Sequence, residues 1–347
     1  MNPLQHFQFG LQMSITKNIG AVYTGEEKWI GGVLAPNNKI YFAPSKSPQI
    51  LQLDLNTNIT SFIGDSYVGD YKTAGGVLAP NGKIYFIPLQ LNRVLQLDPS
   101  NNITSLIGTN YPGTFKWYGG ILAPNGKIYF SPYDADQVLQ LDPTTNTTTM
   151  IGTSYIGSSK WAGGVLGTNN KIYFAPRDAD QILELDPNTN TTTLIGTSYV
   201  GVGKYTSGVL ATNGKIYFIP TNNTNTMELD ISTNTTTLIP PTYSGFGGVL
   251  GLNGNIYFTP NTTTQVAELE TNTNSLNLIG SMFSGSLKWA GGVLAPNGKI
   301  YFTPLNATQV LELSKVGTPN LIGVDAIIPT PLSDLPISNY NKYYNKL

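Results

Sequence analysis

Residues 31–42 read Gly-Gly-Val-Leu-Ala-Pro-Asn-Asn-Lys-Ile-Tyr-Phe, and close variants of this phrase occur seven times along the chain. The copies are spaced by 44 residues except for one interval of 40, and they begin at Gly31, Gly75, Gly119, Gly163, Ser207, Gly247 and Gly291. Self-similarity at a fixed period of this size indicates one supersecondary unit that is repeated and stacked. We therefore expect the 347 residues to build one repeat domain rather than several unrelated domains.

The third unit shows how each repeat is predicted to fold. Its residues 119–123 and 127–131 are apolar runs joined by Pro-Asn-Gly, and Asn-Gly is a strong short-range signal for a hairpin. Residues 138–142 have the pattern of a third strand, and a Pro-Thr-Thr-Asn turn leads to a fourth strand at 147–151. The unit has no helical periodicity. We therefore predict an all-β protein with four antiparallel strands in each unit.

A hydrophobic gradient orients these four strands. The first two, such as Gly-Val-Leu-Ala and Ile-Tyr-Phe, are apolar on both faces, whereas the third and fourth alternate or become polar. Inner strands between neighbouring sheets need apolar residues on both faces, and paired glycines suit a crowded axis. The repeat therefore predicts a seven-bladed β-propeller with the first strand of each blade at the axis.

The ring can be closed from either end of the chain. Residues 14–19 resemble a fourth strand and precede the first complete unit, so the N-terminal segment would supply the outer strand of the last blade. Residues 318–322 offer a competing fourth strand, but Pro319 lacks the N–H that a strand ladder needs. We favour closure by the N-terminal strand, which divides the chain into a leader at 1–13, the propeller at 14–323 and a Pro-, Tyr- and Asn-rich tail at 324–347.

The phrase Pro-Asn-Gly-Lys-Ile-Tyr-Phe, followed by Val-Leu-Gln-Leu-Asp-Pro and a Thr-Asn-Thr turn, resembles the propeller repeats of the YVTN and NHL type. The resemblance covers residues 14–323 and implies the propeller fold. It does not select a function, because this fold hosts lectins, scaffolds, lactonases and lyases. Among propeller enzymes, the gluconolactonase-like families hold a divalent cation at the axis with Glu, Asp and Asn of the inner strands. The streptogramin lyases, whose repeats look similar, use an axial His and Glu with magnesium.

Composition narrows the chemistry. Cysteine is absent, so disulfides and thiolate metal sites are excluded, and the single histidine, His6, precedes the repeats. A net charge of −1 offers no field for nucleic acid, and no apolar run approaches the 18 residues of a membrane span. The N-terminus shows no basic region followed by an apolar run, so we expect no cleavable signal and leave the compartment open.

The predicted inner strands read Gly-Gly-Val-Leu-Ala or close variants and contain no Asp, Glu or His. A hard cation needs several oxygen ligands, and acid–base catalysis needs a titratable group within reach. We therefore expect no metal, no cofactor and no catalytic residue at the axis, and a protein that is not an enzyme. An aspartate that recurs after the third strand is interpreted as a turn former, at Asp54, Asp98, Asp142, Asp186 and Asp230.

The loop before each inner strand carries the clearest candidate binding residues. It contains Tyr-x-Gly and then Lys followed by an aromatic residue, except that in the second unit Tyr71 precedes Lys72 instead, and all four tryptophans of the protein follow the lysine. The loop between the second and third strands shares the same end of a propeller and adds Asp and Gln, with Arg93 and Arg177 as local charges. The candidate ligand-binding residues are Lys28, Trp29, Lys72, Lys116, Trp117, Lys160, Trp161, Lys204, Tyr205, Lys288, Trp289, Asp136, Gln137, Asp180 and Gln181.

Two interpretations of this pattern are open. In the first, aromatic faces stack on sugars, amides and charges bond the hydroxyls, and repetition around the ring adds avidity to weak single sites. In the second, the tryptophans are wedges between blades and the lysines pair with neighbouring Asp side chains, contacts worth about 0–1 kcal/mol each when exposed. The loop at 241–246 is shorter and lacks the lysine, so one sector of this end should be more open.

The leading hypothesis is a non-catalytic recognition module, multivalent and lectin-like, with a carbohydrate or protein partner and no nucleic-acid partner. The first alternative is a structural or assembly protein of a coat or particle, because low charge, a polar Asn/Thr surface and docking of the aromatic tail at 324–347 would suit that role. The second alternative is a propeller lactonase or lyase, which a stoichiometric axial cation would identify.

Overall fold

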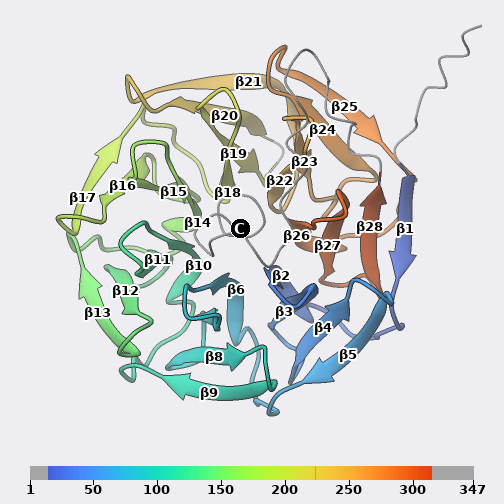
Figure 1. Ribbon diagram of the computed structural model, residues 1–347. Coiled ribbons are helices and arrows are strands. Elements are labelled where there is room, and N and C mark those ends of the chain that lie inside the picture. The colour runs from blue at the N-terminus through green and yellow to red at the C-terminus, as the bar shows by residue number, and fades with distance from the viewer. Residues whose placement is uncertain (1–14, 223, 315–347) are drawn as a thin grey trace, which may run out of the picture.

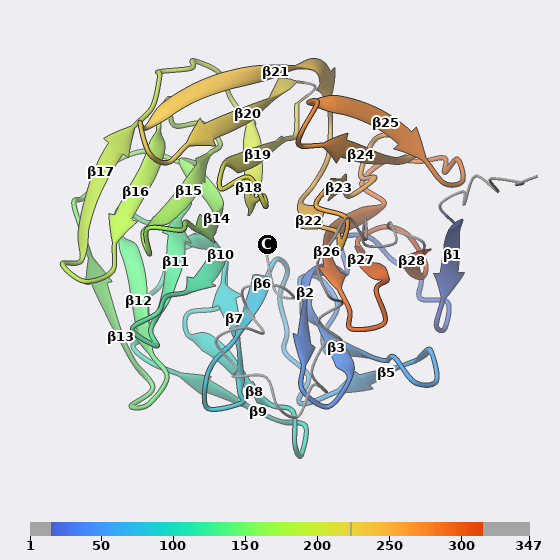
Figure 2. The same cartoon turned by 45° about the horizontal axis from the view of Figure 1, so that its top comes forward.

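The computed structural model describes residues 15–222 and 224–314, which form seven antiparallel four-stranded sheets arranged in a ring (Figure 1). The view turned by 45° shows these sheets as blades around a central axis, with the first strand of each unit innermost (Figure 2). The described residues contain 28 strands and no helix, and so no helix that could cross a membrane. The fold is the seven-bladed β-propeller that the repeat predicts.

Blades 1 to 7 are numbered by their innermost strands, which are β2 (Trp29–Ala35), β6 (Thr73–Leu78), β10 (Trp117–Leu122), β14 (Trp161–Leu166), β18 (Tyr205–Leu210), β22 (Gly248–Leu250) and β26 (Trp289–Leu294). The second strands are β3 (Lys39–Pro44), β7 (Ile84–Pro88), β11 (Ile128–Pro132), β15 (Ile172–Pro176), β19 (Ile216–Pro220), β23 (Ile256–Phe258) and β27 (Ile300–Pro304). The third strands are β4 (Ile50–Asp54), β8 (Val94–Asp98), β12 (Val138–Asp142), β16 (Ile182–Asp186), β20 (Thr224–Asp230), β24 (Val266–Glu270) and β28 (Val310–Ser314). The outermost strands are β5 (Ile59–Ile63), β9 (Ile103–Ile107), β13 (Thr147–Ile151), β17 (Thr191–Ile195), β21 (Thr235–Tyr243), β25 (Ser275–Ile279) and β1 (Ile15–Ile19).

The ring is closed by the N-terminal strand. β1 pairs antiparallel with β28, from Ile15 opposite Ser314 to Ile19 opposite Val310, and so completes blade 7. The prediction of N-terminal closure is confirmed. The competing segment at 318–322, the leader at 1–13 and the tail at 324–347 lie outside the described residues, and what we expect of them stays a prediction.

The burial of the strands follows the hydrophobic gradient. Every residue of β2 is buried, whereas β5 is exposed at three of its five positions. The apolar side chains meet between blades, as where Phe130 of blade 3 packs in one cluster with Val77 and Tyr85 of blade 2. Burying a side chain of this size contributes about 1.5–3 kcal/mol, so each blade depends on its neighbours for its core.

The paired glycines belong to the crowded axis, as the sequence predicts. Gly119 has a φ of +80°, and a Cβ added there would lie 2.6 Å from the Cα of Gly163 in the next blade. No real Cβ tolerates such an approach to backbone, so a side chain at this position would force the two innermost strands apart.

Candidate functional site

Two sets of loops lie together at one end of the ring, called here the loop end. One set joins each outermost strand to the next innermost strand, and the other joins the second and third strands of a blade. Hydrogen bonds connect the sets, since the N–H of Lys116 donates to the Leu89 carbonyl over 2.9 Å and that of Tyr111 to Asn92 over 2.8 Å. The loop end comprises residues 20–28, 64–72, 108–116, 152–160, 196–204, 244–247 and 280–288 with 45–49, 89–93, 133–137, 177–181, 259–265 and 305–309.

The six lysines of the loop end lie inside the fold, each between 2% and 5% exposed. Each ammonium group donates to the carbonyl of the glycine three residues earlier, over 2.5–2.8 Å. Most donate a second bond to the preceding blade, as Lys116 does to the Leu89 carbonyl over 3.2 Å. The expected pairing with Asp side chains is wrong, because backbone carbonyls take these positions. Burial lowers the pKa of Lys28, Lys72 and Lys116 to about 8.

The four tryptophans are also buried, and none is more than 3% exposed. Their Nε1 atoms donate over 2.9–3.0 Å to the carbonyl of the residue 20 positions later, which is Gln137 for Trp117. Trp117 packs in one cluster with Tyr85 of blade 2 and Ile128 of blade 3. The rings are therefore wedges between blades, as the second interpretation states. The stacking of sugars on them needs correction, because a ligand at this end would meet the loops that the rings support and not the ring faces.

The remaining predicted residues divide between support and exposure. Tyr205 takes the tryptophan position in blade 5 and donates to the Asn225 carbonyl over 3.2 Å. The side-chain amides of Gln137 and Gln181 donate to the carbonyls of two glycines over 2.7 and 2.8 Å. Asp136 and Asp180 are exposed on the same loops. That any of these residues contacts a ligand stays a prediction.

An apolar cluster at the axis was not singled out from the sequence. Its core is buried, and Tyr71, Phe115, Tyr118, Phe246 and Leu287 are half-buried around it. The rings of Tyr118 and Phe246, from blades 3 and 6, lie with centroids 6.4 Å apart across the axis. We call this set the axial cluster, with a core of Ile30, Ala74, Leu89, Ala290 and Leu305. The sequence holds a signal for part of it, since the residue before the repeated lysine changes from blade to blade and is large and apolar or aromatic at Tyr71, Phe115 and Leu287.

A charged group borders the axial cluster on the side of blades 1 and 2. The ammonium group of Lys46 lies 2.5 Å from a carboxylate oxygen of Glu27, and the hydroxyl of Tyr71 donates to the same oxygen over 2.6 Å. Burial raises the pKa of Glu27, but the bonds from Lys46 and Tyr71 outweigh it and hold the pKa below its usual value. These three side chains bond one another, so they shape the rim of the loop end.

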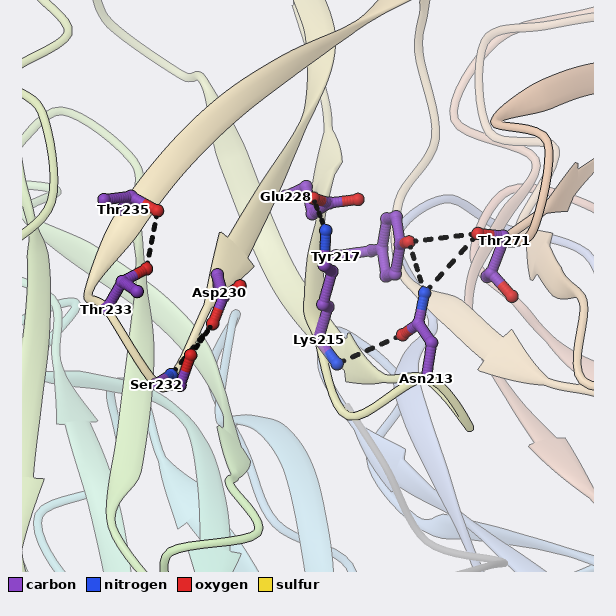
Figure 3. Close-up of polar contacts among 9 residues, drawn as sticks. All are labelled: Asn213, Lys215, Tyr217, Glu228, Asp230, Ser232, Thr233, Thr235 and Thr271. Atoms are coloured by element: carbon purple, nitrogen blue, oxygen red, sulfur yellow. Dashed lines mark hydrogen bonds and ion pairs between the residues drawn. The ribbon is translucent and has the colours of Figure 1, made fainter.

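The opposite end of the ring, called here the turn end, carries the turns within the blades. Between blades 4 and 5 it holds a pocket of about 420 Å³, lined by Thr168, Asn169, Asn213, Gly214, Lys215, Asp230, Ile231 and Ser232. The polar groups on the blade 5 side bond one another (Figure 3). Lys215 pairs with Glu228 over 2.6 Å, and Asn213 donates to the hydroxyl of Tyr217 over 2.9 Å.

The seam that holds the pocket lacks an inter-blade contact that two other seams have. Between blades 2 and 3, the amide of Gln96 donates to the Asn146 side chain over 2.9 Å. In blade 4 the corresponding residue is Glu184, which pairs with Lys171 over 2.7 Å. A carboxylate has no hydrogen to donate, so this seam lacks the bond that Gln makes.

The recurring aspartates form turns, as predicted. The carboxylate of Asp142 accepts the N–H of Thr144 over 2.9 Å, and the same bond recurs at Asp54, Asp98, Asp186 and Asp230. The turn at Asp230 is seen in Figure 3, where Ser232 bonds the carboxylate. Within residues 15–222 and 224–314, no group of three or more His, Asp or Glu is placed to hold a metal ion.

Fold and loop geometry together define a seven-bladed propeller whose repeated lysines and aromatic residues are internal supports. The sequence matches no protein-family model and no curated protein. The structure is similar to that of a streptogramin B lyase, with 17% identity, a TM-score of 0.72 and coverage of 87% of this chain and 97% of the other. It is also similar to virginiamycin B lyase from Staphylococcus aureus, at 13% identity, a TM-score of 0.70 and coverage of 86% and 99%.

Similar structures also include proteins with other descriptions. An auxiliary nutrient binding protein from Bacteroides thetaiotaomicron is 16% identical, with a TM-score of 0.57 and coverage of 87% of this chain and 76% of the other. The extracellular domain of a putative hybrid two component system from the same organism is 11% identical, with a TM-score of 0.65, and the match spans 88% of this chain and 42% of the other. At these identities the likeness shows the fold and leaves the activity open.

Proposed function

We propose that the protein is a non-catalytic recognition propeller that binds its partner through the loop end. One observation carries this proposal, which is the division of roles among neighbouring residues of the same loop. The repeated Lys and the aromatic residue after it are buried and hold the loop. The residue just before the lysine differs among the six blades that have it, being Glu27, Tyr71, Phe115, Ser159, Gly203 and Leu287.

This division suits recognition for a physical reason. A loop held by buried bonds loses little conformational freedom on binding, so its outward residues contribute more of their contact energy to affinity. The axial cluster adds half-buried aromatic side chains, which are the residue types that dominate binding surfaces. Because the repeated tryptophans are covered, the structure favours one composite site at the axis over several equivalent sugar sites around the ring.

The similar structures include lyases and a nutrient-binding protein, so the fold favours neither catalysis nor binding. An enzyme of the lyase or lactonase kind would need titratable or metal-binding groups at its site. Metal analysis of the purified full-length chain tests this alternative, and a stoichiometric divalent ion would contradict the proposal. An assembly role would depend on residues 324–347, so deletion of that tail tests it separately.

Binding itself is tested by screening the full-length protein against glycans, small metabolites and candidate protein partners. Phe115→Arg alters the loop end, and Leu252→Arg introduces the same charge at an exposed site of the turn end. We expect a true partner to lose affinity with the first variant and keep it with the second. A partner that responds only to Leu252→Arg would contradict recognition through the loop end.

A further inference from the structure

Side chains of three successive blades break the repeat at the axis. Tyr118 of blade 3 and Thr206 of blade 5 are the second residues of their innermost strands, where blades 2, 4 and 7 have alanine. Arg177 of blade 4 directly follows its second strand, at the position that is Leu89 in blade 2. Since closely related blades fold without these side chains, the fold alone does not require them.

Tyr118 and Arg177 meet around a third side chain, Tyr133. The guanidinium carbon of Arg177 lies 5.6 Å from the centroid of the Tyr133 ring, and the Tyr118 ring centroid lies 5.6 Å from the same ring. Burial raises the pKa of Tyr118 well above its usual value, although the nearby positive charge of Arg177 opposes this rise. The Tyr118 hydroxyl therefore remains protonated and able to donate a hydrogen bond.

Neither polar group has a partner among the described residues. Within residues 15–222 and 224–314, the Nε of Arg177 and the hydroxyl of Tyr118 are both buried without a hydrogen bond, and Arg177 forms no ion pair. Arginine carries five N–H donors in a planar fork, and leaving the buried Nε–H without a partner costs free energy. The hydroxyls of Thr206 and Ser207, in the adjacent blade 5, are also buried and have no hydrogen bond within the part of the chain that the structure describes.

We propose that Arg177 and Tyr118 bind the oxyanion of a small organic acid, a carboxylate or a phosphate, whose apolar part lies on the axial cluster. A bidentate guanidinium fork fits either anion, and the phenol adds a further donor. Phe246, whose ring lies 6.4 Å from that of Tyr118, belongs to the shortened loop and supplies apolar surface on the far side of the axis. This inference rests on the proposed function and assigns a ligand class to the loop end.

The proposed site has a polar side and an apolar side, so it should prefer a ligand that has both an anionic group and an apolar group. Arg177 and its hydroxyl-bearing neighbours lie in blades 3 to 5, whereas the half-buried apolar side chains Tyr71, Phe115 and Leu287 come from the loops before the innermost strands of blades 2, 3 and 7. A bare anion would leave the apolar half uncovered, and an uncharged aromatic would leave Arg177 unpaired. A ligand that carries an oxyanion and an apolar group pairs Arg177 and covers the apolar side chains at the same time.

The test is isothermal titration of the full-length protein with five defined probes. Phenylacetate and phenyl phosphate carry both features, acetate and inorganic phosphate carry the anion alone, and 2-phenylethanol carries the ring alone. We expect the better of the two aromatic anions to bind about tenfold or more tightly than acetate, inorganic phosphate or 2-phenylethanol. Each of these three probes can either pair with the guanidinium fork or cover the axial cluster, but cannot do both. Preference for phenylacetate or for phenyl phosphate then shows which oxyanion the site takes, and either supports the proposal.

Arg177→Gln should weaken the better aromatic anion by about tenfold or more, and Tyr118→Phe by a smaller factor, since it removes one donor. Arg93→Gln is the matched control, because Arg93 is an exposed arginine in the same type of loop and its loss changes the net charge equally. Without ligand, Arg177→Gln should keep or raise the melting temperature, since it removes an unpaired charge. A purely structural arginine would give a lower melting temperature.

Equal weakening by Arg93→Gln and Arg177→Gln would overturn the proposal, because it would reduce the effect to overall charge. Binding of 2-phenylethanol as tight as that of the aromatic anions, or no binding of any probe, would overturn it as well. The anion site and the proposed function can fail separately. A partner that is lost with Phe115→Arg but bound normally by Arg177→Gln would leave recognition through the loop end intact and exclude the anion site.

Discussion

The ammonium group of Lys28 donates a hydrogen bond of 2.9 Å to the carbonyl oxygen of Leu305 and so joins the first blade to the last. The ammonium groups of four equivalent lysines, Lys72, Lys116, Lys160 and Lys288, likewise donate to a carbonyl of the preceding blade. The positive charge strengthens these hydrogen bonds, but burial away from water disfavours the charged form of the lysine side chain. The stability of the protein should therefore depend on pH where these lysines titrate.

The stability of the propeller should rise between about pH 8 and pH 9.5. Burial lowers the pKa of Lys28, Lys72 and Lys116 to about 8 in the folded protein, against 10.5 for the unperturbed group. In this window the unfolded chain binds more protons than the folded one, so the free energy of unfolding increases with pH. Urea unfolding at several pH values measures it. Lys116→Met should reduce the slope, and an unchanged slope would show that this lysine does not titrate in the window.

Trp117→Ala should lower the free energy of unfolding by about 3–5 kcal/mol, because it opens a cavity between blades 2 and 3. It also leaves the Gln137 carbonyl without the indole donor at 3.0 Å. Trp117→Phe keeps most of the volume and should cost less. Chemical denaturation of both variants measures the difference. A loss below about 1 kcal/mol for the alanine variant would contradict the role of the ring as a wedge.

Gly119→Ala and Gly126→Ala form a matched pair that separates backbone strain from crowding. Both glycines have a φ near +80°, but a Cβ at Gly119 would lie 2.6 Å from the Gly163 backbone, whereas one at Gly126 meets nothing within 4 Å. We expect a cost of about 1 kcal/mol at Gly126 from φ alone and a cost at least about 2 kcal/mol larger at Gly119. Similar melting temperatures for the two variants would argue against close approach of the innermost strands.

Gln140→Glu should weaken the seam between blades 3 and 4 at the turn end. The Gln140 amide donates to the Asn190 side chain over 2.9 Å and to the hydroxyl of Tyr129 over 3.1 Å. The variant loses both donors, and a pair with Lys127 returns only part of the loss. We expect a net decrease of about 1 kcal/mol in the free energy of unfolding, measured by denaturation. Glu184→Gln in the neighbouring seam is the reciprocal control and should not destabilise the protein.

Most of the fold follows from the sequence because its determinants are local and repeated. The Asn-Gly turns, the gradient from Gly-Val-Leu-Ala to Thr-Thr-Thr-Met-Ile and the fixed spacing determine four strands per blade and seven blades. The strand pattern at 14–19 identifies the segment that closes the ring, and Asp142 and its equivalents determine the outer turns. Each of these features acts within one unit or between equivalent positions, so the amino-acid sequence by itself predicts them.

The tertiary structure alone decided which loop-end residues face solvent. A Lys-Trp pair before an inner strand is compatible with an open binding face or with a packed wedge, and only the closeness of the neighbouring blade buries Trp117 and turns the Lys116 ammonium onto backbone carbonyls. In the same way, Tyr118 and Phe246 meet because the ring brings blades 3 and 6 to one axis. Contacts between blades distant in sequence depend on ring closure and packing, which no local pattern encodes.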